Sequence, residues 1–480
     1  MTAPEHSRAH SALAALAVIA LVLWCLLWGF AHTDLTLRTR PAQLVFFFSA
    51  FFVYLIAAGL AWWLGHRATR ATVIFVIAAG ILFRVTLAPV RPVTTSDIFR
   101  YLWEGRVVNA GANPYREAPT SPKLAALRDW VWQGVDFKQV PAAYPPVAQY
   151  VFAIADRIPA SRIVTLKLIL AAFDIGTVLL LPGLMLGLRR PPIWALLYAW
   201  HPLIVGEVVA RGHLDSVGIF FLILTIRLLL VQTSAHRALT GAALAAGTLA
   251  KGYAIITLPF FLRAARSHRH WLALGFLGMA IAAYLPFSSA GRDLFTGIAL
   301  YSTKWTGYGA VFPLVDWSVS HCTAAHLETA RRICGLAVLG WLAVLLLKQS
   351  RDSSVDGTLE CCFLALAGFY VLSPVLYPWY LAWTVPFLCF RPRPGWVVLT
   401  GTVFIFYAQT YADPKMTLPW LTALEYGVPL CVAVVSAGIA RSRRASPESR
   451  ATDGAEGPDA GETVTLRPCP SKLRHKGRRC

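Results

Sequence analysis

A carboxylate at the start of a short helical segment is the first group in this sequence that could carry out acid–base chemistry. Ser96 suits a helix N-cap, and Asp97 then lies in the first turn, where the helix dipole stabilises a negative charge. Helical spacing gives one face of this segment the following side chains: Asp97, Arg100 or Tyr101, and Glu104. A positioned carboxylate of this kind can remove a proton from a substrate. The structural alternative is a capped surface helix whose charged face is only solvated.

A second group of ionisable residues interrupts the otherwise apolar segment WHPLIVGEVVARGHLDSVG at 200–218. These residues are His201, Glu207, Arg211, His213 and Asp215. A charged side chain at the centre of a bilayer costs about 2.5–3.5 kcal/mol, so such groups normally face a cavity and have partners. The cluster therefore indicates a polar site on the same side of the membrane as Asp97. The alternative is a short turn in water, which needs no function.

Lys251 lies near the middle of another apolar run, in TLAKGYAII. It either snorkels to one membrane surface or forms an anion site at a break between two half-helices. Lys304 and Tyr377 belong to two aromatic segments, YSTKWTGYG and PVLYPWYLAW. Tyr and Trp near the ends of spans usually form interfacial belts, but a substrate pocket could use the same side chains as walls.

Long apolar runs must position these residues. The 480-residue chain is 57% hydrophobic and 14% charged, which excludes an ordinary soluble or disordered protein. Runs of 18 or more apolar residues recur along it, and each is long enough for a helix to cross the hydrocarbon layer. The sequence thus predicts an all-α polytopic membrane protein with about 13–14 transmembrane or half-membrane helices. The first run, 11–30, is too long for the core of a signal peptide and is predicted to be an uncleaved span.

Basic residues set the expected orientation. The 44 Lys and Arg against 24 Asp and Glu give a formal net charge of +20, which we attribute to cytoplasmic loops and not to nucleic-acid binding. The basic loop 65–70 is expected in the cytoplasm, so residues 91–161 lie outside and contain amphipathic helices near 96–108 and 144–155. Both termini are expected in the cytoplasm.

The segment 241–262 lies between two basic clusters that both favour the cytoplasm. Two half-length helices that meet near Lys251 and Gly252 would satisfy both clusters, because irregular backbone is tolerated where it lines a polar cavity. The alternative is one span with one basic loop on the wrong side. Elsewhere, Asp174 is expected to form a structural ion pair within the membrane, with Lys167 or Arg162 as its partner.

Five segments, taken in order, resemble the GT-C superfamily of integral-membrane glycosyltransferases. The likeness is closest to bacterial polyprenyl-phosphate-mannose-dependent mannosyltransferases of glycosyltransferase family 87. The segments are SDIFRYLWEGRVVNAGANPY, YPPVAQY, WHPLIVGEVVARGHLDSVG, LAKGYAIITLPFFL and VLYPWYLAW, within residues 71–391. The resemblance implies a multi-span fold whose first large external loop supplies a catalytic acid, for which Asp97 is the matching position. It also implies sugar donors carried on a polyprenyl phosphate and used on the outer face.

The resemblance suggests a glycosyltransferase that moves a hexose to a glycan, lipid or protein acceptor at the cell membrane. The choice of mannose as this hexose rests on the resemblance alone. Asp97 would be the general base of an inverting displacement. The expected substrate-binding residues are Arg100, Tyr101, Glu104, Arg211, His213, Asp215, Lys251, Lys304 and Tyr377. Arg211, His213 and Lys251 are assigned to the phosphate, and Glu104 and Asp215 to acceptor hydroxyls.

No cofactor is expected, and the requirement for a divalent metal ion stays open. Many relatives carry two adjacent acidic residues in the loop, whereas Ser96 precedes Asp97 here, which argues against a metal-binding pair. The expected parts of the chain are N-terminal spans (1–90), the external loop with the candidate acid (91–161), helices that form the donor cavity (162–440) and a disordered basic cytoplasmic tail (441–480). A transporter or flippase of a lipid-linked or small solute is the main alternative function, and an inactive scaffold is another.

Overall fold

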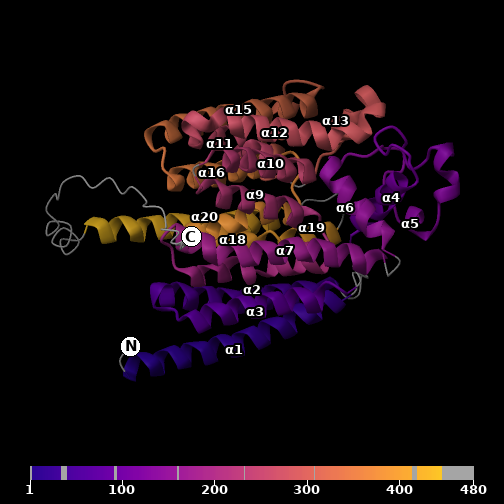
Figure 1. The fold of residues 1–480 in the computed structure, drawn as a ribbon. Coiled ribbons are helices and arrows are strands. Elements are labelled where there is room, and N and C mark those ends of the chain that lie inside the picture. Colours follow the sequence, from indigo (N-terminus) through magenta and orange to yellow (C-terminus); the bar gives the residue numbers. More distant parts are fainter. Residues whose placement is uncertain are drawn as a thin grey trace, which may run out of the picture. The chain divides into compact units, whose positions relative to one another are not determined.

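The computed structural model describes residues 3–33, 40–90, 95–158, 162–231, 233–307, 309–412 and 419–445. Helices are the only regular elements in these segments, which confirms the all-α prediction (Figure 1). Residues Met1–Val432 form one compact unit, and a second unit begins at Ala433. Nearly all of the predicted tail, from residue 446 onward, lies outside the described residues.

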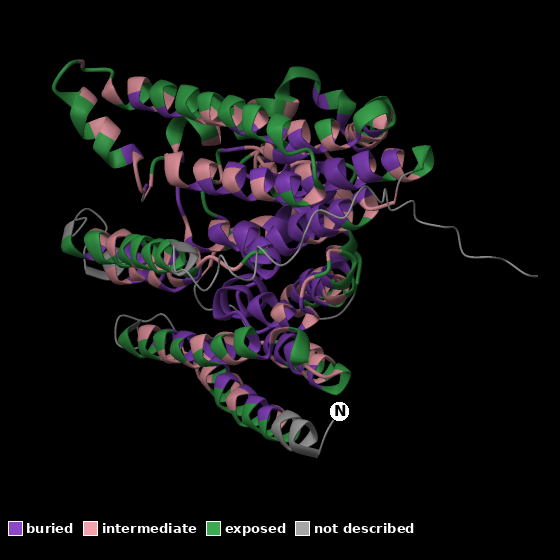
Figure 2. Cartoon of the chain, turned by 90° about the vertical axis from the view of Figure 1, so that its left-hand side faces the viewer, coloured by how far each residue is buried: buried purple, intermediate pink, exposed green. Residues whose placement is uncertain are grey.

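Within the described segments, eight helical stretches are long and apolar enough to cross a membrane. They contain α1 (Ala3–His32), α2 (Arg40–Leu64), α3 (Arg70–Leu87), α7 (Arg162–Gly187), α12 (Arg269–Tyr284), α15 (His326–Arg351), α16 (Val355–Leu372) and α20 (Pro419–Ala445). Large apolar side chains such as Leu21, Phe52 and Leu336 are exposed on these helices. Figure 2 shows exposed and buried residues on the same long helices, as expected where one face meets lipid. The chain is a multi-pass membrane protein.

Besides the eight full-length spans, prolines divide several apolar runs of the described segments into short helices. The stretch after α16 is an example, with proline in the first turn of three successive elements. Proline lacks a backbone donor, so a helix tends to restart there. The elements of this stretch are η8 (Pro378–Thr384), α17 (Val385–Phe390), α18 (Pro394–Thr402) and α19 (Ile405–Ala412).

The segment 200–218 is a bend in the middle of the protein. η3 (Pro192–Ala195) and α8 (Leu196–Ala199) turn by 58° into η4 (Ile204–Ala210), which is a π-helix, and α9 (Asp215–Leu229) follows. Every residue from 200 to 218 is buried. The alternative of a short turn in water is therefore wrong.

The predicted break at Lys251 and Gly252 is confirmed. α10 (Ser234–Lys251) ends there, Gly252 adopts a φ of +85°, and the chain returns through η5 (Tyr253–Thr257) and α11 (Leu258–Ala264). The starts of α10 and α12 pack together, since a Cβ on Gly241 would lie 1.9 Å from the carbonyl oxygen of Leu272. Their ends also share one cluster of buried side chains. Because the two helices run in parallel, the basic clusters that precede them lie at the same end, as predicted.

The first loop contains the two predicted helices, α4 (Asp97–Asn109) and α6 (Pro146–Arg157). They pack directly on each other: the ring of Tyr101 stacks on Phe152 with centroids 4.7 Å apart, and Gly105 lies against the Phe152 carbonyl. The remaining elements are η1 (Gly65–Arg67), η2 (Pro122–Leu127), α5 (Trp130–Gln133), η6 (Arg266–His268), η7 (Leu285–Phe295), α13 (Thr296–Lys304) and α14 (Phe312–Ser320).

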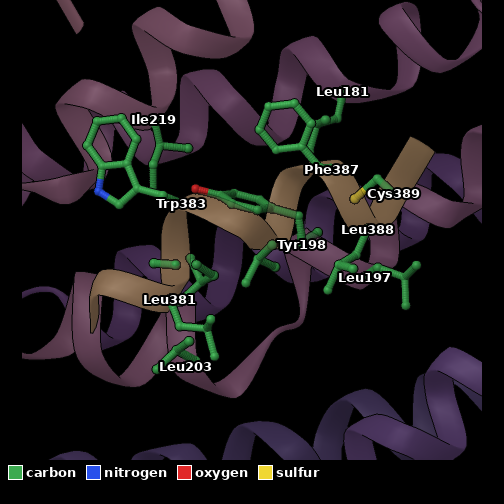
Figure 3. Close-up of a cluster of buried hydrophobic side chains, with 14 of the residues drawn as sticks. Leu181, Leu197, Tyr198, Leu203, Ile219, Leu381, Trp383, Phe387, Leu388 and Cys389 are labelled. Carbon is green, nitrogen blue, oxygen red and sulfur yellow. The ribbon is translucent and has the colours of Figure 1, made fainter. Parts of the chain in front are cut away.

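Buried apolar side chains from α7, α8, α9 and α17 meet in the core (Figure 3). Within this core the hydroxyl of Tyr198 and the guanidinium of Arg84 both donate to the carboxylate of Asp174. Arg84 also donates to the carbonyl of Ala199 at 2.6 Å, so the charge pair ties α3 to α7 and α8. The expectation that Asp174 pairs with Lys167 or Arg162 is wrong. Tyr198 and Arg84 come from other elements, which only the packing of the helices brings alongside α7.

Candidate active site

Asp97 opens α4, and solvent reaches its carboxylate. The side chain is 36% exposed, and its Oδ2 lies 3.7 Å from Nδ1 of His213. Burial raises the pKa of the Asp97 carboxyl, but the interaction with His213 and the charges of Lys251 and Arg100 outweigh it, so the pKa lies below its usual value. The carboxyl is thus ionised at neutral pH, which is the state in which it can accept a proton.

His213 lies between two carboxylates. Its Nδ1 faces Asp97, and its Nε2 lies 3.6 Å from Oε2 of Glu207. The imidazole stacks on Trp379, with centroids 4.0 Å apart and planes inclined by 14°. Gly212 precedes it with a φ of +77°, a conformation that glycine adopts without strain. An imidazole held in this way can stabilise the Asp97 charge when it is protonated.

Glu207 and Arg211 form an ion pair across one turn, at η4. The hydroxyl of Tyr407 donates to Oε2 of Glu207 at 3.0 Å. The Arg211 guanidinium lies over the rings of Tyr407 and Phe30, at 4.6 Å and 5.0 Å from their centroids. Both ionic side chains are almost completely buried. This pair forms the inner part of the site, separated from Asp97 by the His213 ring.

Lys251 and Asp215 form a second buried ion pair. Nζ of Lys251 lies 2.5 Å from Oδ2 of Asp215, and Nε1 of Trp383 donates to Oδ1 at 2.7 Å. The ammonium also lies 5.1 Å from the centroid of the Tyr380 ring. The snorkelling alternative for Lys251 is therefore wrong, since its side chain points to a carboxylate inside the protein. The break after α10 places this cation where its charge acts on Asp97.

Aromatic side chains from the two other predicted segments form one wall of the site. Tyr377 stacks on Trp379 with centroids 4.6 Å apart, and Trp379 in turn covers His213. The hydroxyls of Tyr301 and Tyr380 lie 2.6 Å apart, which connects α13 to η8. The residues of PVLYPWYLAW thus contact His213 and the Lys251–Asp215 ion pair, and do not merely form an interfacial belt.

Three predicted residues of α4 lie in the interior of the loop. Arg100 donates to the carbonyls of Val140 and Phe137, at 3.0 Å and 3.2 Å. Glu104 is buried and accepts from Gln149 at 2.7 Å, and burial raises the pKa of its carboxyl. Tyr101 is fully buried. The structure does not bring Arg100, Tyr101 or Glu104 to the open side of Asp97, and their substrate-binding roles stay predictions.

The remaining predicted residue, Lys304, ends α13 with an exposed side chain. No ion pair or hydrogen bond of its ammonium is found among the described residues. Within the same residues, no three His, Cys, Asp or Glu side chains are grouped closely enough to hold a metal ion.

The model of the alpha-(1->6)-mannopyranosyltransferase family, N-terminal domain, matches residues 9–267, which is more than half of the chain. The chain belongs to this family. The matched region contains Asp97, Glu207, Arg211, His213 and Lys251.

A relative within the mannopyranosyltransferases is alpha-(1->6)-mannopyranosyltransferase B of Corynebacterium glutamicum. It is 26% identical over 388 residues, which cover 68% of this chain and 61% of the relative. The chain therefore matches less than two thirds of that relative's length. Among solved structures, ArnT from Cupriavidus metallidurans bound to undecaprenyl phosphate aligns with a TM-score of 0.44 and 13% identity, over 76% of this chain and 70% of that one.

Several residues of this mannopyranosyltransferase-family site carried no specific signal in the sequence. Trp379, Tyr380 and Trp383 stood only within a general aromatic segment, and Tyr407 lay in an ordinary apolar run. Glu207 was visible as an ionisable group in segment 200–218 but had no assigned role. Its position four residues before Arg211 is the signal that could have predicted their ion pair.

Proposed function

We propose that this chain is a membrane glycosyltransferase that moves a mannosyl residue from a polyprenyl-phosphate donor to an acceptor hydroxyl on the extracytoplasmic face. Membership of the mannopyranosyltransferase family supports the sugar and the reaction class. The residue pattern of the first external loop supports the donor class. A donor anchored in lipid can reach a site among membrane helices laterally, without crossing water.

In the proposed reaction Asp97 is the general base. Its carboxylate takes the proton of the acceptor hydroxyl while the acceptor oxygen forms a bond to the anomeric carbon. The bond between that carbon and the donor phosphate oxygen breaks, and the electron pair leaves with the polyprenyl phosphate. A single displacement of this kind inverts the configuration at the anomeric carbon.

Charge on the departing phosphate requires cations in a site that excludes water. The charge of Lys251 acts on Asp97 and its side chain is 8% exposed, so we assign the phosphate to Lys251. His213 is fully buried beside Asp97, and we assign it the stabilisation of that carboxylate. Arg211 lies behind His213, on the far side from Asp97, and pairs with Glu207, so we assign it the positioning of that carboxylate. Asp215 holds the ammonium of Lys251 in place. We therefore expect the acceptor to bind at the exposed side of Asp97 and not at Asp215.

One observation carries the assignment of the base. The Asp97 side chain is 36% exposed, whereas those of Glu207 and Asp215 are 0% exposed. An acceptor that arrives from water can reach the first carboxylate but not the other two. The depressed pKa of Asp97 keeps it ionised and ready to take the proton.

The test is transfer of labelled mannose from polyprenyl-phosphate mannose in membranes that contain Asp97→Asn. We expect activity to fall by at least about 100-fold, since general-base catalysis contributes about 10²–10⁴. The amide is close in size to the carboxylate, so the protein should still accumulate in the membrane.

Asp136→Asn is the matched control, because Asp136 is an exposed carboxylate of the same loop. It should keep full activity. Undiminished transfer by Asp97→Asn would refute the base assignment. If the purified protein moved the donor across vesicles without forming a new glycosidic bond, the alternative of a transporter or flippase would replace the enzyme.

A further inference from the structure

A polar cavity of about 250 Å³ lies at the other end of the membrane helices. The residues that line it are Arg190, Asp356, Leu359, Glu360, Phe363, Phe387, Phe390, Arg391 and Arg393. They follow α7, open α16 and flank the end of α17. None of them belongs to the site around Asp97.

The course of two helices places this cavity opposite the Asp97 site. The 26 residues of α7 begin beyond α6 of the external loop and end just before Arg190. At about 1.5 Å per residue, such a helix is about 39 Å long, close to the ~40–45 Å of a bilayer with its headgroups. α16 likewise begins at the cavity and ends shortly before Trp379, which covers His213. The cavity therefore lies at headgroup level on the other membrane surface.

Positive charge exceeds negative charge around the cavity. Glu360 alone is approached by three cations, with Nζ of Lys348 and Nη1 of Arg391 each at 3.4 Å and Arg393 closer still. Arg190 pairs with Asp356 at 3.0 Å. Among the residues that line the cavity, three arginines thus face two carboxylates. In addition, Nε of Arg190 is buried and has no hydrogen-bond partner among the described residues.

The walls combine guanidinium groups with aromatic rings. Phe363, Phe387 and Phe390 are buried and line one side, and the Arg393 guanidinium lies 4.4 Å from the centroid of Phe363. Arg391 is exposed at the mouth, with 68% of its side chain accessible. Guanidinium groups suit the oxygens of a phosphate, and the rings suit the apolar part of a lipid beside it.

We infer that this cavity binds the phosphate of an anionic phospholipid from the membrane surface opposite Asp97. The excess of cations supplies the attraction, and basic pockets between membrane helices on the cytoplasmic side are suited to such headgroups. The apolar walls and the position at headgroup level favour a lipid over a free anion. The site is separate from the donor site proposed above, because about 39 Å of helix lies between them.

The test uses the full chain purified in a mild nonionic detergent and measures its thermal unfolding midpoint. A ligand that binds only the folded protein raises this midpoint in a concentration-dependent way. We expect phosphatidylglycerol, added as mixed micelles with the detergent, to raise it by several degrees. Phosphatidylcholine added in the same form, and inorganic phosphate, should have little effect. The rise should be mostly lost in Arg391→Gln/Arg393→Gln.

A second variant and a control distinguish the loss of lipid binding from a folding defect. Arg190→Gln leaves the partners of Glu360 intact, so it should fold normally and still lose part of the rise. Arg332→Gln removes an exposed arginine paired with Glu328 on α15, away from the cavity lining, and should keep the full rise.

Three results would overturn the inference. One is an undiminished rise with phosphatidylglycerol in both cavity variants. Another is an equal rise with phosphatidylcholine, and the third is a full rise with inorganic phosphate, which would make the ligand a free anion. None of these readouts uses transfer activity, so they leave the proposed enzyme function untouched.

Discussion

Burial separates the acidic residues of the site into two kinds. Glu207 and Asp215 are fully buried and each contacts a cation, so their charges are neutralised within the protein. Buried pairs of this kind are costly to break, because one partner is then left as an uncompensated charge. Asp97 faces His213 at 3.7 Å and remains partly open, so its charge is stabilised without being enclosed. Only this arrangement leaves a carboxylate available for an incoming hydroxyl.

Replacing His213 with Gln should shift the acid limb of the activity profile to higher pH. Burial raises the pKa of Asp97 and His213 lowers it, so removal of the imidazole leaves burial less opposed and the pKa rises. The carboxylate then becomes protonated, and activity is lost, at a higher pH as the pH falls. The measurement is kcat/KM for transfer as a function of pH, which reports the pKa values of the free enzyme.

His270→Gln provides the comparison for this pH profile, because His270 is exposed at the start of α12. Its acid limb should coincide with that of the unmodified protein. An unshifted limb in His213→Gln, with activity retained, would show that His213 does not set the pKa of the base.

At the scale of elements, two interruptions of α-helical geometry position the charged groups. The π-helix η4 widens the turn that carries Glu207, and π-bulges are frequent at functional sites. The break at Gly252 ends α10 just after Lys251, so that the ammonium lies at the helix end and beside Asp215. α4 adds Asp97 from the loop, and its position depends on close packing against α6.

Gly105→Ala should move α4 away from α6 and lower both stability and transfer. A Cβ at this position would lie 2.3 Å from the carbonyl oxygen of Phe152, and a backbone atom cannot move aside as a flexible side chain can. Overpacking of this kind costs about 1–3 kcal/mol. The thermal unfolding midpoint and the transfer rate measure the two effects.

Gly59→Ala is the matched change. It adds the same methyl group at a position in the middle of the α2 sequence, where the new Cβ would have no other atom within 4 Å. It should leave the unfolding midpoint unchanged or slightly raised. If Gly105→Ala behaved like Gly59→Ala, the contact between α4 and α6 would not position Asp97.

At the scale of the compact unit Met1–Val432, charged groups gather at the two ends of the membrane helices. Asp97, His213 and Lys251 lie at one end, and Arg190 and Arg393 lie at the other. Excess Lys and Arg mark the cytoplasmic side. The end with Arg190 is therefore expected in the cytoplasm, and the Asp97 site on the outer face.

Reporter fusions test this orientation in living cells. Alkaline phosphatase inserted beside Lys123, an exposed residue of the first loop, should be active, because the enzyme matures only outside the cytoplasm. The same reporter inserted at Arg67 in η1 should be inactive. The reverse pattern would place Asp97 on the cytoplasmic side and exclude a donor used on the outer face.

Much of the architecture was encoded locally. The length of the apolar runs predicts the membrane helices, since a span needs about 20 apolar residues whatever its neighbours are. The sequence around 96–108 and 144–155 predicts α4 and α6, and the two basic clusters predict the break at Lys251 and Gly252. Each of these signals depends on residues close together in the chain, so each is readable without the fold.

Only the tertiary structure decided which residues pair with the buried charged side chains. Trp383 donates to Asp215 across 168 residues, and Tyr407 to Glu207 across 200, and no periodicity predicts such contacts. The same holds for Asp174, which pairs with Arg84 of α3 and not with a neighbour on its own helix. Apolar helices can pack on one another in many ways, and the partner of a buried charge is fixed only when one packing is chosen. The sequence alone therefore determines that buried charges must be paired, and the fold determines with which residues.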